Sequence, residues 1–234
     1  MLKDNLLKVF LILIIVVSNG NSKVYSEEVT TTLPDGSIYV GKIKNGLFHG
    51  YGKLTWLDGS TYIGEFSKGL MDGKGIKTER NGAKYIGMYR KGSPDGKGEL
   101  HYPSGDEYIG EFKQGLPYGK GELTYVNGDK YTGEFMDGML HGNGVLVYVD
   151  GMRYEGEFKR DIKSGRGKIV YINGNYYKGE IENDLPNGKG KWVSMNGDFY
   201  TGEFKNGEFH GKGRYTYKDG KVLEGYFELG GFKK

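Results

Sequence analysis

The chain has 234 residues, and its 33 lysines and arginines nearly balance 30 acidic residues, so charge gives no general argument for nucleic-acid binding. It contains no cysteine, which excludes disulfide bonds and thiolate zinc sites. Its 43 glycines do not fall at every third position, which excludes collagen, and its 14% aromatic residues argue against disorder.

The first 22 residues have the pattern of a secretory signal peptide. Lys3 and Lys8 precede a wholly apolar run over residues 9–17, and a polar stretch with small residues follows. This run is well short of the ~20 apolar residues that a membrane-spanning helix needs. The sequence therefore predicts export to the periplasm, the secretory pathway or the cell exterior, with cleavage after Ser22 or Ser26. An uncleaved membrane anchor is the alternative.

A repeat of 23 residues follows the leader. Residues 23–38 are expected to form a linker and an N-terminal half-repeat, residues 39–222 eight full repeats, and residues 223–234 a partial C-terminal capping repeat. With the first tyrosine of each unit as position 0, glycine occupies +2, +11, +13 and +20 in all eight units and +7 in six. Of the 43 glycines, 41 fit this period. The tyrosines at position 0 are Tyr39, Tyr62, Tyr85, Tyr108, Tyr131, Tyr154, Tyr177 and Tyr200.

Each unit is predicted to be two antiparallel strands joined by turns. Asn-Gly and Asp-Gly pairs at +19 and +20, such as Asn127-Gly128, favour a two-residue type I′ turn, which needs two residues at positive φ. Residues 121–126 precede this turn as one strand, and residues 131–135 follow it as the next. Residues 136–142 are expected to form a longer return connection. No segment of the unit has a helical period.

Alternation along these strands predicts which side chains share a face. Positions 0, +2 and +4 carry tyrosine, glycine and usually an aromatic residue, so we expect rings to lie across the bare glycine backbone of neighbouring strands. Glutamate at +3, with lysine and threonine nearby, makes the opposite face polar. The predicted fold is all-β, an extended single-layer antiparallel meander of tandem 23-residue β-hairpins with open edges at both ends.

The repeated pattern YxGEF, followed by hGxG and Y-x-D-G, resembles the MORN repeat (membrane occupation and recognition nexus) over residues 39–222, with partial units at both ends. The resemblance implies a scaffold made of MORN hairpins. The departures from the pattern concern individual loops: Lys42 and Met88 replace the glutamate at +3, Asp161 and Asp184 replace the glycine at +7, and Leu223 replaces the terminal tyrosine.

The sequence offers no arrangement that supports catalysis. No Gly-Lys pair is followed by the serine or threonine of a P-loop. Glutamates at +3, such as Glu134 and Glu157, occupy equivalent surroundings that do not separate two pKa values, so their expected role is cross-strand pairing with lysine. His49, His141 and His210 share position +10 but lie two or more units apart, too far to bind one metal. We therefore expect a non-enzyme with no catalytic residue, cofactor or metal site.

Position +12 provides the candidate interaction surface, expected as a row of cations along one edge of the sheet. Two interpretations of this row remain open: contact with anionic lipid head groups or acidic glycans, or a solvated row that keeps the sheet soluble and blocks edge pairing. The aromatic row is either a ligand surface or the only core of a thin protein. The residues at +12 are Lys74, Lys97, Lys120, Arg166, Lys189 and Lys212.

These patterns predict a non-enzymatic scaffold of the exported space. It is expected to bind a protein partner, or a second copy of itself as a homodimer through the open sheet edges. The alternative is peripheral binding to anionic lipid head groups or cell-surface glycan through the lysine and tyrosine rows. No nucleic-acid partner is expected, and specificity is expected to reside in variable residues such as Met139, Leu140 and His141.

Overall fold

The structure is a computed structural model, and it describes residues 28–233. The expected signal peptide and both predicted cleavage positions lie outside these residues. The chain divides into two compact units, one ending at Pro103 and the other beginning at Ser104. In the described part of the chain, no helix is long and apolar enough to cross a membrane.

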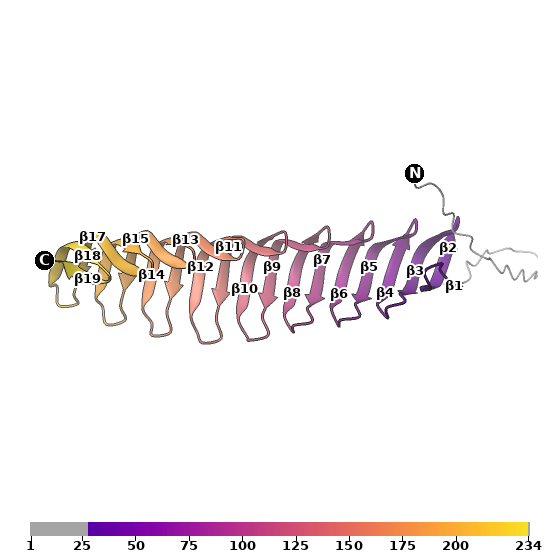
Figure 1. The fold of residues 1–234 in the computed structure, drawn as a ribbon, viewed down its shortest axis with the longest axis horizontal. Helices are drawn as coiled ribbons and strands as arrows, with labels where there is room; N and C mark the ends of the chain where they lie inside the picture. Colours follow the sequence, from indigo (N-terminus) through magenta and orange to yellow (C-terminus); the bar gives the residue numbers. More distant parts are fainter. Residues whose placement is uncertain (1–27, 234) are drawn as a thin grey trace, which may run out of the picture. The chain divides into compact units, whose positions relative to one another are not determined.

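Each of these two compact units contains several repeats and is a meander in which consecutive strands pair in antiparallel fashion (Figure 1). The all-β meander that the sequence predicts is therefore confirmed within each unit. The first unit contains β1 (Val29–Thr32), β2 (Ile38–Lys44), β3 (Leu47–Thr55), β4 (Thr61–Ser67), β5 (Leu70–Thr78), β6 (Lys84–Arg90) and β7 (Ser93–His101). The second contains β8 (Glu107–Lys113), β9 (Leu116–Thr124), β10 (Lys130–Met136), β11 (Met139–Val147), β12 (Arg153–Lys159), β13 (Ile162–Val170), β14 (Tyr176–Glu182), β15 (Leu185–Val193), β16 (Phe199–Lys205), β17 (Glu208–Thr216), β18 (Val222–Glu228) and β19 (Gly231–Lys233).

The two turns of each repeat are exchanged relative to the prediction. The two-residue turn is Asp137-Gly138, with φ of 52° and 84°, and it joins Met136 directly to Met139 in the strand register. The predicted long connection over residues 136–142 is therefore wrong. Asn127-Gly128 instead belongs to a wider loop, where only the glycine has positive φ and the Gly128 N–H donates to the Tyr125 carbonyl at 2.9 Å. A type I′ turn needs positive φ at both central residues, so it forms only at +6 and +7.

Two repeats form the tight turn without glycine at +7. Asp161 and Asp184 each adopt a left-handed φ of 67° there. Each carboxylate accepts a backbone N–H of the preceding repeat, Asp161 from Leu140 at 2.8 Å and Asp184 from Lys163 at 3.0 Å. These hydrogen bonds offset the strain of a non-glycine residue at positive φ, so the meander continues unchanged.

The core is a row of tyrosine rings that fill the space over paired glycines. Tyr131 is fully buried, and Gly133 pairs with Gly144 beneath its ring. A methyl carbon added at either glycine would collide with that ring. Tyr131 also makes edge-to-face contacts with Phe135 at 5.1 Å and with Phe158 of the next repeat at 5.0 Å. The predicted role of the glycines at +2 and +13, as space for rings, matches this packing.

The tyrosine hydroxyl has a separate structural role that the sequence analysis missed. A β-bulge shifts the register between Gly133 and Glu134, and the Tyr131 hydroxyl donates to the Glu134 carbonyl at 2.9 Å. All eight tyrosines at position 0 donate in this way to the carbonyl at +3, at 2.6–3.0 Å. Since phenylalanine cannot make this bond, the bulge explains the choice of tyrosine.

Replacing Tyr89 with phenylalanine is expected to raise the free energy of unfolding by about 1 kcal/mol. Tyr89 is 3% exposed, and its buried hydroxyl has no hydrogen-bond partner. Five other repeats carry phenylalanine at this position, which shows that the site accommodates the ring alone. Urea unfolding measures the effect, with Tyr62→Phe as the control that removes a bonded hydroxyl. Equal destabilisation by both variants would contradict this account.

Alkaline pH is expected to destabilise the fold through its buried tyrosines. Burial raises the pKa of Tyr85 and Tyr200 from 10.0 to about 12. Above pH 10 the unfolded chain loses these protons while the folded chain keeps them, so stability falls as pH rises. The urea midpoint is expected to be constant below about pH 9 and to fall between about pH 10 and pH 12. A flat midpoint across that window would contradict the burial of these hydroxyls.

Candidate functional site

The six cations at +12 are exposed and lie inside strands, on the face opposite the core tyrosines. They do not follow an edge of the sheet, so that part of the prediction is wrong. Lys74 and Lys97 belong to the first unit and the other four to the second. In the second unit, three of the four stand opposite glutamates of the next repeat, in the pairs Lys120–Glu134, Arg166–Glu180 and Lys189–Glu203. Lys212 stands opposite Tyr226.

The glutamates at +3 do not pair with these cations. Among the described residues, no ion pair includes a glutamate at +3 or a cation at +12. Instead, Glu157 lies over Gly165, and its carboxylate accepts the backbone N–H of Arg166 at 2.9 Å. A Cβ on Gly165, which has φ of 64°, would lie 2.6 Å from the Glu157 Cδ. The predicted cross-strand pairing is therefore wrong. The glycine at +11 has positive φ in all eight repeats, and the carboxylate adds a steric reason for it in the repeats that carry glutamate at +3.

The second unit carries a groove of about 1050 Å³ on this polar face. Its lining spans β12 to β17, and each of β13–β16 contributes one segment of three consecutive residues that includes a glycine. Arg166, Lys189 and Lys212 from the predicted row lie in it. Three lysines that the sequence analysis missed join them: Lys168, Lys178 and Lys191. With Glu155, Glu180 and Glu203 also present, the groove has three more positive than negative side chains.

The additional lysines form a continuous row across three strands. Lys168 on β13 is opposite Lys178 on β14, and Lys178 is opposite Lys191 on β15. Within the described residues none of the three makes an ion pair. The Lys168 Nζ lies 4.9 Å from the ring centre of Tyr176, and the Lys191 Nζ lies 4.6 Å from that of Phe199. Cation–π contact thus holds two of the three ammonium groups in place.

The same face has a different character in the first unit. Ile63, Ile76 and Ile86 stand opposite one another on β4, β5 and β6. The prediction of a polar face is therefore wrong at this place, because positions +1 and +14, which hold the three lysines in the second unit, hold isoleucines here. The basic groove is a local feature of the second unit and not a property of every repeat.

A family model described as the MORN repeat matches the chain in eight consecutive segments. These are residues 39–61, 62–84, 85–107, 108–130, 131–153, 154–176, 177–199 and 200–222. The chain belongs to the MORN repeat family. A comparison with curated proteins finds no match.

Solved structures that align with this chain include three domains of CPAP or SAS-4. The CPAP G-box domain aligns with a TM-score of 0.47 and 15% identity, over 86% of this chain and 100% of that chain. The TCP10 domain of Danio rerio CPAP gives 0.44 and 17%, over 83% and 97%. The TCP domain of Drosophila melanogaster SAS-4, in complex with a proline-rich motif of Ana2, gives 0.39 and 11%, over 92% and 99%. Likeness at this level carries no functional argument.

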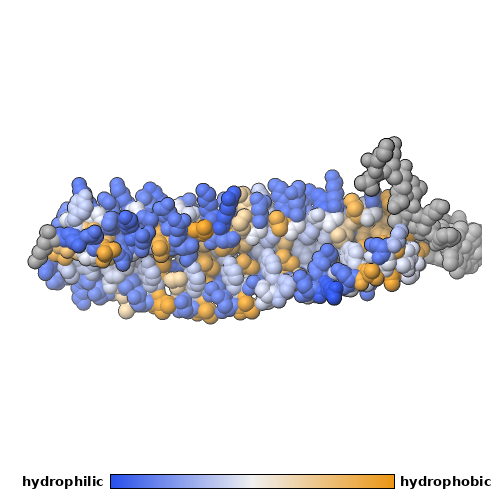
Figure 2. All heavy atoms as spheres, viewed as in Figure 1, coloured by the Kyte–Doolittle hydropathy of each residue, from blue (hydrophilic) through white to orange (hydrophobic). Residues whose placement is uncertain are grey.

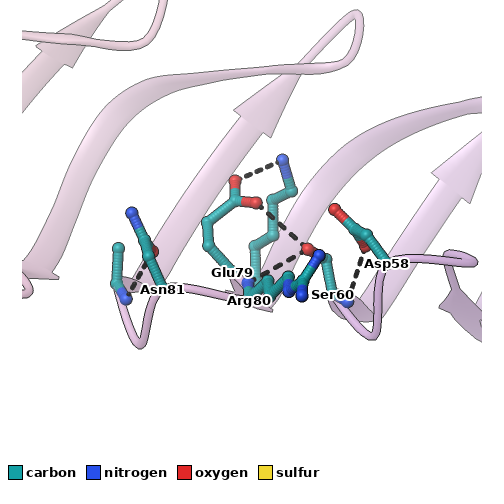
Figure 3. A network of polar contacts seen from close by, with 7 residues as sticks. Asp58, Ser60, Glu79, Arg80 and Asn81 are labelled. Atoms are coloured by element: carbon teal, nitrogen blue, oxygen red, sulfur yellow. Dashed lines mark hydrogen bonds and ion pairs between the residues drawn. The ribbon is translucent and has the colours of Figure 1, made fainter.

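The wider loops link successive MORN repeats through side chains. In the first unit, Figure 3 shows the Arg80 N–H donating to the Ser60 hydroxyl at 3.2 Å, while that hydroxyl lies 3.4 Å from the Glu79 carboxylate. The same geometry recurs in the second unit, where Asp106 accepts the N–H of Val126 at 2.8 Å and Asp129 that of Val149 at 2.9 Å. The side chain at +21 thus fixes the residue at +18 of the next repeat.

These loops hold an exposed apolar row in the second unit, which we call the apolar rim. Its four members occupy +18 in successive MORN repeats and are 67–78% exposed: Val126, Val149, Ile172 and Met195. Figure 2 shows orange and beige spheres along the lower rim of this part of the molecule. No role was predicted for position +18, although its apolar residues beside a turn are visible in the sequence.

The other sequence-predicted candidates do not converge on a site. The eight tyrosines at position 0 are buried, so they form the core and cannot contact a ligand. Leu140 is also buried, at 4% exposed, which removes it from the residues expected to give specificity. His141 and His210 lie on β11 and β17, six strands apart in the meander, and the His141 Nδ1 is buried without a partner.

Proposed function

We propose that the chain is a non-enzymatic MORN-repeat scaffold of the exported space that binds a protein partner through the second unit. The observation that carries this proposal is the apolar rim. Four large apolar side chains in successive repeats are exposed to solvent. Contiguous exposed apolar residues bordered by polar ones are typical of protein-binding surfaces.

The rim is also ordered before a partner arrives. The backbone N–H groups of Val126, Val149 and Met195 are held by side chains of the preceding repeat at 2.8–2.9 Å. A fixed surface loses little conformational entropy on binding, which favours affinity. Membership of a repeat family supports the scaffold role, since repeat proteins present extended binding surfaces.

Cross-linking and mass spectrometry on the exported fraction of the native organism test this proposal. The wild-type chain is compared with a rim variant that carries Val126→Ser, Val149→Ser, Ile172→Ser and Met195→Ser. We expect a partner protein with the wild type and its loss with the rim variant. Cross-links found only between copies of the chain would indicate a homodimer instead of a separate partner. Capture of the same partner by the wild type and the rim variant would contradict the proposal.

The exported location rests on the leader pattern, residues 1–22. N-terminal sequencing of the mature protein from its native fraction tests it. Cleavage after Ser22 or Ser26 is expected. A chain recovered from the cytosol with its first residues intact would contradict export, and an intact chain in the membrane fraction would indicate the uncleaved anchor.

A further inference from the structure

The lysine row in the groove of the second unit destabilises the sheet. Lys168, Lys178 and Lys191 stand directly opposite one another on adjacent strands, and like charges in such pairs destabilise a sheet. Of the three, Lys168 alone has a carboxylate opposite it, Glu155 on β12. Lys178 lies between the other two lysines, and Lys191 lies between Lys178 and Thr201. Within the described residues none of the three forms an ion pair, so the row is suited to an anion that approaches from outside.

The shape of the groove indicates an elongated ligand lying across the strands. Each central strand contributes only three consecutive residues, so the groove is narrow along the strands. Its lining continues from Glu155 on β12 to Lys212 on β17. Five strand spacings of ~4.8 Å give a length of about 24 Å. A single rod fits these proportions better than a compact anion.

Two other classes of anionic ligand fit less well. Tyr176 and Phe199 each carry one lysine ammonium group over the ring, which a sugar stacked on that face would have to displace. Glu180 and Glu203 stand in the groove among the cations. Their carboxylates would oppose a dense anionic surface such as a membrane, but they leave room for a rod whose charges follow one stripe.

A helix with one acidic stripe matches both the spacing and the neighbouring surface. Carboxylates three or four residues apart recur about every 5.4 Å along a helix, close to the ~4.8 Å between strands. Beside the lysine row, Val170, Tyr176, Val193 and Phe199 form a parallel apolar row in register. The acidic stripe of a helix would lie on the lysines while an adjacent apolar stripe contacts this second row.

We propose that the groove binds an amphipathic α-helix of a partner protein, with carboxylates along one stripe and apolar side chains along the next. A groove of about 24 Å corresponds to about 16 helical residues at 1.5 Å each. The carboxylates meet Lys168, Lys178 and Lys191, and Arg166, Lys189 and Lys212 face the outer side of the helix. This inference rests on the proposed function, because it assigns the chemistry of the partner that the scaffold binds.

Fluorescence anisotropy with the full chain tests the proposal. The probe is a stapled helix of about 16 residues with glutamate in one stripe and leucine in the next, and the second probe has lysine at every glutamate. Lys168→Gln, Lys178→Gln and Lys191→Gln are combined in the groove variant. Lys113→Gln, Lys159→Gln and Lys205→Gln form the control variant, which has the same net charge and alters exposed lysines of the same unit outside the main groove.

We expect the glutamate helix to bind and the lysine helix not to bind. The groove variant should weaken binding at least about tenfold, while the control variant stays within about twofold. Removing like charges should leave the thermal midpoint unchanged or higher, which separates lost binding from lost folding. Equal weakening in both variants, or no binding of the glutamate helix, would overturn the proposal.

Two further arms identify the competing ligands. Phosphatidylserine vesicles and polygalacturonate are tested against the same variants. Binding of either one that is lost in the groove variant, without binding of the glutamate helix, would assign the groove to that anion instead. In the native cross-linking experiment, a partner retained by the groove variant would refute the helix groove but leave the proposed scaffold function standing. Binding of the glutamate helix, with no partner captured in the native organism, would support the helix groove and contradict the proposed scaffold function.

Discussion

Tyr131→Ala is expected to lower the free energy of unfolding by about 4 kcal/mol. The ring is fully buried, fills the space over Gly133 and Gly144, and contacts Phe135 and Phe158. Its removal leaves a cavity that the flanking glycines cannot fill. Because the chain has two compact units, amide hydrogen exchange of β10 and β11 is the measurement, since it reports local unfolding.

Tyr131→Phe is the matched control for this prediction. It keeps the ring and removes only the hydroxyl that donates to the Glu134 carbonyl at 2.9 Å. We expect a loss of about 1 kcal/mol. If the alanine and phenylalanine variants lost the same amount, the hydroxyl at the bulge, and not ring packing, would account for the effect of Tyr131.

Gly144→Ala is expected to destabilise the same hairpin by about 3 kcal/mol. Its backbone is not left-handed, so the cost is steric: the new methyl group would overlap the Tyr131 ring, which has no free space into which to move. Hydrogen exchange of β10 and β11 again measures the loss. Unchanged protection would contradict the packing of rings over glycine.

Two comparisons make the cause of this effect specific. Gly151 has φ of 94°, and no atom lies within 4 Å of a Cβ added there. Gly151→Ala is therefore expected to lower the free energy of unfolding by about 1 kcal/mol, through backbone strain alone. In the double variant with Tyr131→Ala, the alanine at 144 should add almost nothing, because the ring it displaces is already absent. Additive losses would show that Gly144 is required for another reason.

The repeat and its core were predictable because both follow from position in the sequence. Glycines at +2 and +13 and the tyrosine at 0 recur without insertion, so alternation alone places Tyr131 over Gly133 and Gly144. Residue type signals the tight turn in only some repeats. Asn45-Gly46, Asp137-Gly138 and Asn206-Gly207 carry the same Asn-Gly or Asp-Gly signal as the pairs at +19 and +20, so this signal alone does not say which of the two turns is tight. Position +6 is Lys68 in one repeat and Gln114 in another, and neither residue signals the left-handed backbone that both adopt.

The groove could not be predicted from the sequence for a related reason. Lys168 and Lys191 occupy position +14 and Lys178 position +1, so the three do not share a column of the repeat. They become neighbours only through the strand register, and the register depends on the turn that was misplaced and on the bulge at Gly133–Glu134 and its equivalents. The row at +12 was predicted because it is a column, but its glutamate partners bind backbone instead.

Site-specific photo-cross-linking in the native organism tests most directly whether the second unit is a protein-binding surface. A photoreactive benzoylphenylalanine replaces Ile172 in the apolar rim, and Thr132, exposed on β10, serves as the control position. A discrete adduct with one partner protein is expected from position 172 and none from position 132. Absence of an adduct at 172, or equal adducts at both positions, would contradict the role of the rim.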